Sequence, residues 1–164
     1  MMLPPISKHV LNPFNPHGRF GRLSYLAWQT VIFLIAIPLN IYISYEMFGI
    51  GLTEPYKKPD LLALFLFVTL ALFVVYSSLV FAIRRLHDCN RSGWFVLLLG
   101  MPYLNILMLV YLLIARGDHN SNRYAPVQPT ATWKKIMAYI GLGLIFILSV
   151  LIFIVITKSH TVFP

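Results

Sequence analysis

Apolar residues dominate four long stretches of the chain, and polar residues gather between them. The four stretches cover residues 25–45, 61–83, 94–115 and 136–156. A helix needs about 20 apolar residues to cross the hydrocarbon core of a bilayer. None of the stretches alternates apolar and polar positions as the strands of a membrane β-barrel do. The pattern therefore predicts an all-α, polytopic membrane protein with four hydrophobic helical segments.

The third segment differs from the others because Gly100, Pro102 and Asn105 fall in its middle. Proline removes a backbone donor and breaks or kinks a helix. We therefore predict a break at Gly100–Pro102, with two possible outcomes. The segment either crosses the membrane as a kinked helix or is re-entrant, with two half-helices that enter and return. Pro38 and Asn40 mark a second candidate break, in the first segment.

Three regions follow from this pattern. Residues 1–24 form an N-terminal tail, residues 25–126 a membrane core with the first three segments, and residues 127–164 a linker with an additional helix. Asp60 is a plausible N-cap for the second segment, because aspartate side chains accept hydrogen bonds from the first amides of a helix. Gly141 and Gly143 allow another helix to approach the fourth segment closely.

Composition supports the membrane prediction. Of 164 residues, 59% are hydrophobic, and 13 basic residues face only 5 acidic ones. The mean hydropathy is +0.77, whereas soluble domains are only about 45–50% apolar. A disordered chain, a disulfide scaffold and an ordinary soluble enzyme are excluded, and the single Cys89 cannot form an internal disulfide. The basic residues lie in short loops, which predicts contact with anionic lipid rather than with nucleic acid.

The distribution of Lys and Arg also predicts orientation, because cytoplasmic loops carry an excess of both. With a cytoplasmic N-terminus and four spans, seven basic residues lie inside and six outside. With a re-entrant third segment, the counts become ten inside and three outside. The positive-inside rule therefore favours the re-entrant arrangement in the bacterial inner membrane, with the N-terminus in the cytoplasm.

The densest polar motif is the run from Arg84 to Trp94, between the second and third segments. If the second helix continues for two turns, Arg84, His87, Asp88 and Arg91 share one face. Asp88 would then hold a guanidinium group or orient the His87 imidazole. Two simpler interpretations stay open: Arg84 and Arg85 act only as a topology signal, and His87 with Asp88 acts only as a structural pair. Catalysis would require shifted pKa values, which a sequence does not reveal.

Smaller features of this motif and its neighbours predict local structure. Asn90 suits the left-handed conformation that ends a helix, and Ser92 suits the cap of the next one. Trp94 suits the membrane interface, and Gly117 is expected to end the third segment. The histidines show no paired spacing, so no metal site is predicted, and no motif implies a cofactor. The candidate polar cluster comprises Arg19, Arg22, Arg84, Arg85, His87, Asp88, Arg91, Ser92, Trp94, Asn122 and Arg123.

These motifs resemble the DUF805 family, small bacterial inner-membrane proteins of unknown function. The resemblance covers roughly residues 14–126. Its central signature is Arg-Arg-Leu-His-Asp, two residues, then Arg-Ser-Gly-Trp, and it matches residues 84–94 without interruption. An opening Gly-Arg motif at residues 18–25 and a closing turn at residues 117–126 accompany it. The resemblance implies a membrane fold but no activity, and the fourth segment extends the shorter family plan.

Three functional hypotheses follow. The arginine clusters at three helix ends would converge in the re-entrant arrangement, and would bind an anionic lipid headgroup or a partner membrane protein. An oligomeric transporter or channel subunit is the second hypothesis, with the helix breaks exposing backbone groups. A lipid-phosphate enzyme using His87 and Asp88 as an acid–base pair is the third. The sequence favours the non-enzymatic hypothesis, because no activated nucleophile is evident. A homo-oligomer is compatible with the first two.

Overall fold

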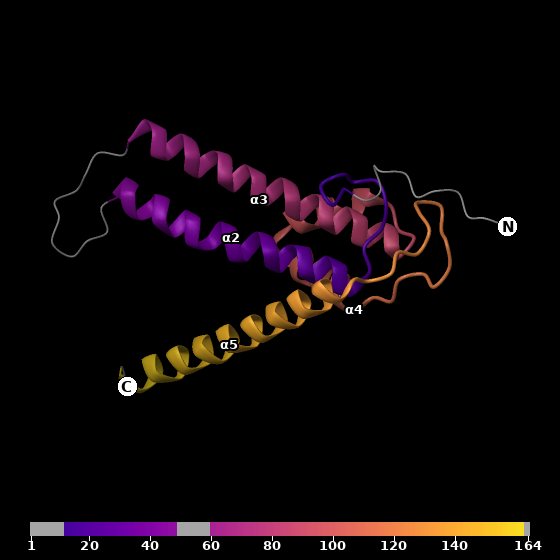
Figure 1. Ribbon diagram of the computed structural model, residues 1–164. Helices are drawn as coiled ribbons and strands as arrows, with labels where there is room; N and C mark the ends of the chain where they lie inside the picture. The colour runs from indigo at the N-terminus through magenta and orange to yellow at the C-terminus, as the bar shows by residue number, and fades with distance from the viewer. Residues whose placement is uncertain (1–11, 49–59, 163–164) are drawn as a thin grey trace.

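The computed structural model describes residues 12–48 and 60–162, and every regular element in these ranges is helical (Figure 1). The elements are α2 (Arg22–Phe48), α3 (Leu61–Asp88), η1 (Gly93–Gly100), α4 (Pro102–Ile114) and α5 (Thr132–Val162). The prediction of an all-α chain is confirmed for these residues. Lys8, Lys57 and Lys58, which entered the charge counts, lie outside the described residues.

Within residues 12–48 and 60–162, three helices, rather than four, are long and apolar enough to cross a membrane. They are α2, α3 and α5. Helices α2 and α3 run side by side in opposite directions, and α5 starts beside the first turns of α2 and then diverges from it (Figure 1). The first turns of α2 and α5 and the last turn of α3 therefore share one end of the bundle, which we call the polar end.

The third apolar segment is broken where the sequence predicts it. The 3₁₀-helix η1 ends at Gly100, and α4 begins at Pro102, a position where proline costs no hydrogen bond. Helix α4 has 13 residues, about 20 Å at 1.5 Å per residue, against a hydrocarbon core of about 30 Å. The chain then returns to the polar end, where the Asp118 amide donates to the Asp88 carbonyl oxygen at 2.8 Å.

Several helix boundaries differ from the predicted ones. Helix α3 continues to Asp88, five residues beyond the predicted end, so Arg84, His87 and Asp88 lie inside it. The expectation that Arg91 shares their helical face is wrong, because α3 ends before Arg91. Helices α2 and α5 are also longer than predicted at both ends. The prediction of a break at Pro38 is wrong, because α2 is continuous through it. The Asn40 side chain donates to the carbonyl oxygen of Ala36 in the preceding turn at 3.1 Å.

Of the three predicted helix caps, one is confirmed by its side-chain hydrogen bond. Asp60 caps α3 as expected, accepting a hydrogen bond from the Leu62 amide at 3.2 Å. Ser92 occupies the N-cap position of η1, but its side chain makes no capping hydrogen bond. The expectation that Gly117 ends the third segment is wrong, since the C-cap of α4 is Ala115. Gly117 instead provides space for a neighbouring carboxylate.

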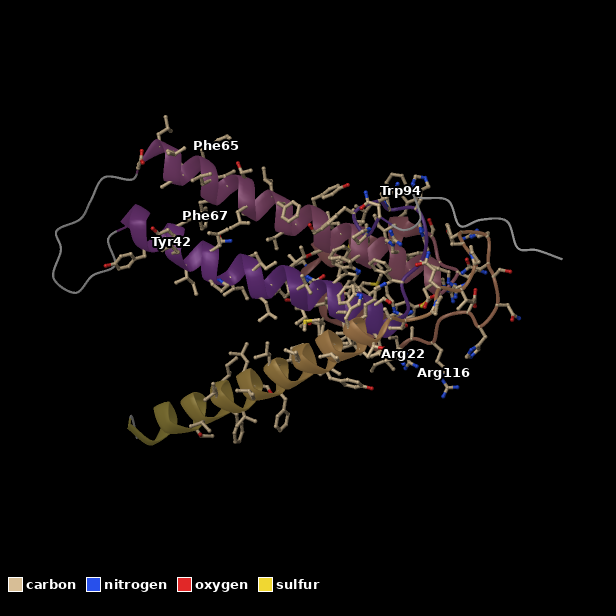
Figure 2. All side chains as sticks on the ribbon, viewed as in Figure 1. Arg22, Tyr42, Phe65, Phe67, Trp94 and Arg116 are labelled. Atoms are coloured by element: carbon tan, nitrogen blue, oxygen red, sulfur yellow. The ribbon has the colours of Figure 1, made fainter. Side chains whose placement is uncertain are left out.

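The well-packed core lies toward the polar end. Phe20, Phe81, Leu86 and Leu112 are buried there among aromatic and aliphatic neighbours. By contrast, apolar side chains farther along the helices are exposed, including Tyr42 and Phe65 at the opposite end (Figure 2). Of the two glycines expected to allow close packing, Gly141 contacts Thr30 of α2, whereas Gly143 has no such neighbour. Exposed apolar surface along three long helices is the pattern expected where lipid is the solvent.

Candidate functional site

The centre of the polar end is one buried carboxylate held by two buried arginines. Arg19 Nε lies 2.7 Å from Asp88 Oδ1, and Arg85 Nη1 lies 2.5 Å from Asp88 Oδ2. The Arg19 and Asp88 side chains are 2% and 9% exposed, and that of Arg85 is fully buried. These are the only ion pairs among the described residues. We call the three residues the arginine clamp, because each guanidinium also binds a neighbouring chain segment.

Arg85 connects α3 to the end of α4. Its Nε donates to the Leu112 carbonyl oxygen at 2.9 Å, and its Nη2 donates to the carbonyl oxygen of Ala115. The last carbonyl groups of a helix have no partner within the helix. Arg85 supplies these missing donors, so the C-terminal end of α4 is fixed against the C-terminal end of α3.

Arg19 connects the segment before α2 to the loop after α4. Its Nη1 donates to the Asn120 carbonyl oxygen at 2.8 Å, and its Nη2 to the carbonyl oxygen of Asp118. Both carbonyl groups belong to the chain that returns from α4. The forked guanidinium makes this possible, because it presents donors in several fixed directions at once.

Gly117 is required by the clamp. A Cβ atom at this position would lie 1.9 Å from Asp88 Oδ2, so any side chain would force the loop or the carboxylate to move. The loop backbone therefore passes directly over the carboxylate. The sequence predicted that Gly117 ends a helix, whereas the structure requires a glycine here because of the adjacent carboxylate.

Arg84 is buried beside the clamp and fixes the N-terminal segment. Its Nη1 donates to the carbonyl oxygens of Asn12 at 2.5 Å and Asn15 at 2.9 Å. Its guanidinium carbon lies 4.1 Å from the centre of the Phe20 ring, a cation–π arrangement. The Phe20 amide donates to the Arg84 carbonyl oxygen at 3.0 Å. The arginine pair of the central motif therefore holds two different segments onto α3.

His87 and Asp88 do not form the pair that the catalytic hypothesis needs. Each Asp88 oxygen accepts from an arginine, and His87 Nδ1 lies 3.3 Å from the Gly18 carbonyl oxygen, to which it donates. The His87 ring stacks on Tyr124 with the ring centres 3.8 Å apart. His87 thus takes part in packing the loop after α4 against α3.

Asn122 caps α3 from this loop. Its Nδ2 donates to the His87 carbonyl oxygen at 2.7 Å, while its Oδ1 accepts from the amides of Tyr124 and Ala125. Asn90 has a φ of 55°, as predicted, and the Arg91 amide donates to the Leu86 carbonyl oxygen at 2.9 Å. These bonds satisfy the last carbonyl groups of α3.

Four other arginines at the polar end are exposed. Arg22, Arg91, Arg116 and Arg123 form what we call the basic collar. None makes an ion pair with a described residue, and Arg123 only approaches the Asn90 carbonyl oxygen at 3.5 Å and the Tyr124 ring. Figure 2 labels Arg22 and Arg116, which project outward from the polar end.

A polar recess of about 200 Å³ lies between Arg22 of the collar and the clamp residues Arg19 and Asp88. It lies between the start of α2 and the loop after α4, and Arg22, Ser24, Gln128 and Thr130 contribute to its walls, together with clamp residues and Asp118. Gln128 Nε2 is buried and has no hydrogen-bond partner. Gly21, Arg22 and Ser24 at the start of α2 line the recess, and a helix N-terminus favours an anion.

Cys89 follows the clamp and is half-buried. Burial raises the pKa of the Cys89 thiol, and nearby Arg85 lowers it in part. The thiolate is the reactive form of cysteine, so the raised pKa disfavours reaction of this thiol at neutral pH. Among the described residues, no group of His, Cys, Asp or Glu side chains has the arrangement of a metal site.

Three membrane-length helices, a broken third segment and a buried charge cluster at one end define a small polytopic membrane protein. The family described as "Protein of unknown function (DUF805)" matches residues 13–126. The chain belongs to this family. The clamp and the basic collar lie within the matched region, and α5 follows it.

Relatives with curated names agree with a membrane protein. The chain is 32% identical over 107 residues to the inner membrane protein YhaI of Escherichia coli K12, covering 65% of this chain and 80% of that protein. It is 34% identical over 61 residues to the inner membrane protein YhaH of the same strain, covering 34% of this chain and 50% of that protein. No solved structure matches the chain.

The structure divides the predicted polar cluster. Arg19 and Arg85 contact Asp88 directly, and Asn122 contacts the His87 carbonyl oxygen. Arg84 is buried at the same end but binds Asn12 and Asn15 instead. The remaining predicted residues surround them: Arg22, Arg91, Trp94 and Arg123 are exposed, and Ser92 is half-buried. Sequence reasoning missed Gln128, and it missed the backbone carbonyl groups that the arginines bind. Backbone acceptors carry no sequence signal, and Gln128 lies in a stretch without a recognisable motif.

Proposed function

We propose that this protein is a non-enzymatic inner-membrane module that binds anionic phospholipid headgroups through its basic collar. In this account the arginine clamp maintains the fold, and the exposed arginines bind the ligand. The observation that carries the proposal is that the buried and the exposed arginines differ in their binding partners. The clamp arginines are satisfied by protein groups, whereas Arg22, Arg91 and Arg116 are exposed and make no ion pair with a described residue.

Charge at the polar end supports an anionic ligand. Nine described Arg and Lys residues belong to this end, against the two carboxylates of Asp88 and Asp118. Asp88 is already paired with two arginines. The remaining positive charge attracts anionic lipid, with each basic group near the surface contributing about 1 kcal/mol.

The recess beside Arg22 supports a phosphate group as the part recognised. Arg22 offers a forked donor and Gln128 Nε2 a buried donor without a partner among the described residues, and the recess lies at the N-terminus of α2. Phosphate and carboxylate are the anions that suit such donors. In a membrane, phospholipid headgroups are the abundant source of phosphate at this depth.

Orientation follows from the same charges. The positive-inside rule assigns the polar end, and with it the N-terminal segment, to the cytoplasm. The third segment is then re-entrant, entering the cytoplasmic leaflet as η1 and leaving it as α4. The inner membrane is the location named for the relatives YhaI and YhaH, and we assign this chain to the same membrane.

The test is thermal unfolding of the purified protein in neutral detergent, with phosphatidylglycerol or phosphatidylcholine added. A ligand that binds only the folded state raises the unfolding temperature. We expect phosphatidylglycerol to raise it more than phosphatidylcholine does, and added salt to reduce the difference. A variant carrying Arg22→Gln, Arg91→Gln and Arg116→Gln should keep its unfolding temperature without lipid and lose the response. Equal responses to both lipids, or an unchanged response in the variant, would overturn the proposal.

A further inference from the structure

An apolar cleft lies within the broken third segment and against Leu86 near the end of α3. It has a volume of about 410 Å³ and lies between η1 and α4. Its walls are formed by Leu86, Phe95, Leu98, Leu104, Leu107, Met108 and Tyr111, with Arg91. Small-molecule sites typically measure about 300–1,000 Å³ and are mostly apolar with a few polar groups. The size and lining of this cleft match that description.

Arg91 is the single charged group of the cleft, and it differs from the other arginines of the central motif. Arg84 and Arg85 are buried and bind protein carbonyl groups, whereas Arg91 is exposed and makes no ion pair with a described residue. Its backbone is fixed by the hydrogen bond from its amide to the Leu86 carbonyl oxygen. A fixed cation beside an apolar cleft is complementary to an amphiphile that carries an anionic group and an alkyl chain.

We infer that this cleft is a specific phospholipid site, in which one acyl chain lies between η1 and α4 and the phosphate binds Arg91. The inference rests on the proposed function and adds the part of the lipid that confers specificity. A site that bound only an anionic headgroup would need no apolar cleft. A site that bound only an acyl chain would need no arginine, so the presence of both features points to a whole phospholipid.

The bilayer position of the cleft agrees with this ligand. Helix η1 has eight residues and α4 has 13, so each reaches only about 16–20 Å from the polar end. This depth corresponds to one leaflet of a hydrocarbon core about 30 Å thick. A phospholipid of the same leaflet has its phosphate at the level of Arg91 and its chains at the level of the cleft.

Bound palmitoyl-oleoyl phosphatidylglycerol, counted by native mass spectrometry after release from detergent, provides the test. Leu104→Trp places a large ring in the cleft, and its control is Leu109→Trp. The two leucines lie on α4 and are 41% and 43% exposed, but Leu109 does not line the cleft. We expect Leu104→Trp to lower lipid occupancy severalfold and Leu109→Trp to leave it unchanged.

A second pair of variants tests the headgroup contact. Arg91→Gln should weaken binding by about tenfold, because a charge-assisted hydrogen bond is lost. Lys135→Gln removes an exposed cation that belongs neither to the basic collar nor to the cleft, and its effect should be much smaller. The unaltered protein gives a third readout that needs no variant. Palmitoyl lysophosphatidylglycerol should displace the bound lipid, and glycerol 3-phosphate, which lacks the chain, should not.

The outcomes separate this inference from the proposed function. Suppose that collar variants reduce phosphatidylglycerol binding, while Leu104→Trp binds normally and glycerol 3-phosphate competes as well as the lysolipid. The cleft site would then be wrong and the headgroup proposal would stand. If phosphatidylglycerol is bound no better than phosphatidylcholine and no variant alters binding, both are wrong. Loss of binding in Leu104→Trp and Arg91→Gln alone, with competition by the lysolipid, supports the cleft.

Discussion

Two groups of arginines occupy the same end of this molecule in opposite environments. Arg19, Arg84 and Arg85 are almost fully buried, and their guanidinium groups bind carbonyl oxygens or Asp88. Arg22, Arg91 and Arg116 are exposed and make no ion pair with a described residue. Members of the two groups are only a few positions apart in sequence. Residue type therefore does not determine the role here; burial and available partners do.

The buried group shows what a guanidinium can do for a small membrane protein. Hydrophobic burial drives helices together only weakly in lipid, so packing and hydrogen bonds carry more of the association. The clamp joins the segment before α2, the end of α3, the end of α4 and the following loop through one carboxylate. The short helix α4 of the broken third segment is fixed in this way.

Substitution of Asp88 should have the largest effect on stability. Asp88→Asn removes the countercharge of both Arg19 and Arg85, and breaking a buried ion pair typically costs about 3–5 kcal/mol. The matched control is Asp118→Asn, an exposed carboxylate of the same end, which should change stability by about 0.5 kcal/mol or less. Equilibrium unfolding in detergent compares the two. Equal losses for both variants would remove the distinction between the buried and exposed groups.

Gly117→Ala should destabilise the protein next most strongly. Its Cβ would lie 1.9 Å from Asp88 Oδ2, so the loop or the carboxylate must move, at about 1–3 kcal/mol for overpacking. Gly100→Ala is the control, because nothing lies within 4 Å of its added Cβ. The same unfolding measurement applies. A stable Gly117→Ala protein would mean that the loop does not pass over the carboxylate.

Arginine-to-lysine substitutions sharpen the comparison within a single motif. Arg19→Lys keeps the charge but cannot reproduce three donors in fixed directions, and each hydrogen bond lost should cost about 1 kcal/mol. Arg22→Lys, three positions later, should leave stability unchanged and instead weaken the response to phosphatidylglycerol. If Arg22→Lys destabilises the protein as much as Arg19→Lys does, Arg22 stabilises the fold as the buried arginines do, and the distinction between the two groups fails.

The smallest expected effect concerns Cys89. Burial raises the pKa of its thiol above the ordinary value, so little thiolate is present at pH 7 and alkylation should be slow. The rate should keep rising as the pH increases through the ordinary thiol pKa of about 8.5. A cysteine introduced by Ser121→Cys in the exposed loop should react faster at pH 7 and level off earlier. Similar pH profiles for both thiols would contradict the burial of Cys89.

The sequence predicted the elements better than the roles of single residues. Periodicity and proline placement indicated the helices and the break at Gly100–Pro102, because both depend on local chemistry. Pro38 misled the same reasoning, since a proline within a long helix can be accommodated by its surroundings. Asn90 and Asp60 behaved as predicted, because their turns and caps are local.

Residue roles at the polar end depended on tertiary contacts that no spacing reveals. The sequence grouped Arg84, Arg85 and Arg91 as one basic motif. Only the fold separates them, because α3 ends at Asp88 and leaves Arg91 beyond it. The sequence also could not identify the carbonyl oxygens of Leu112 or Asn120 as arginine partners, since every residue carries such a group.

The proposed lipid binding requires that the whole polar end lies on one side of the membrane, with the third segment re-entrant. Cysteine labelling tests this directly in a Cys89→Ser background, with Asn120→Cys in the loop after α4 and Ser159→Cys near the end of α5. Cells with an opened outer membrane are treated with a membrane-impermeant maleimide, and lysed cells serve as the accessibility control. The account predicts labelling of the cysteine at position 159 from outside and of the cysteine at position 120 only after lysis. Labelling of position 120 from outside would contradict it, because the loop held by the arginine clamp would then lie on the wrong side.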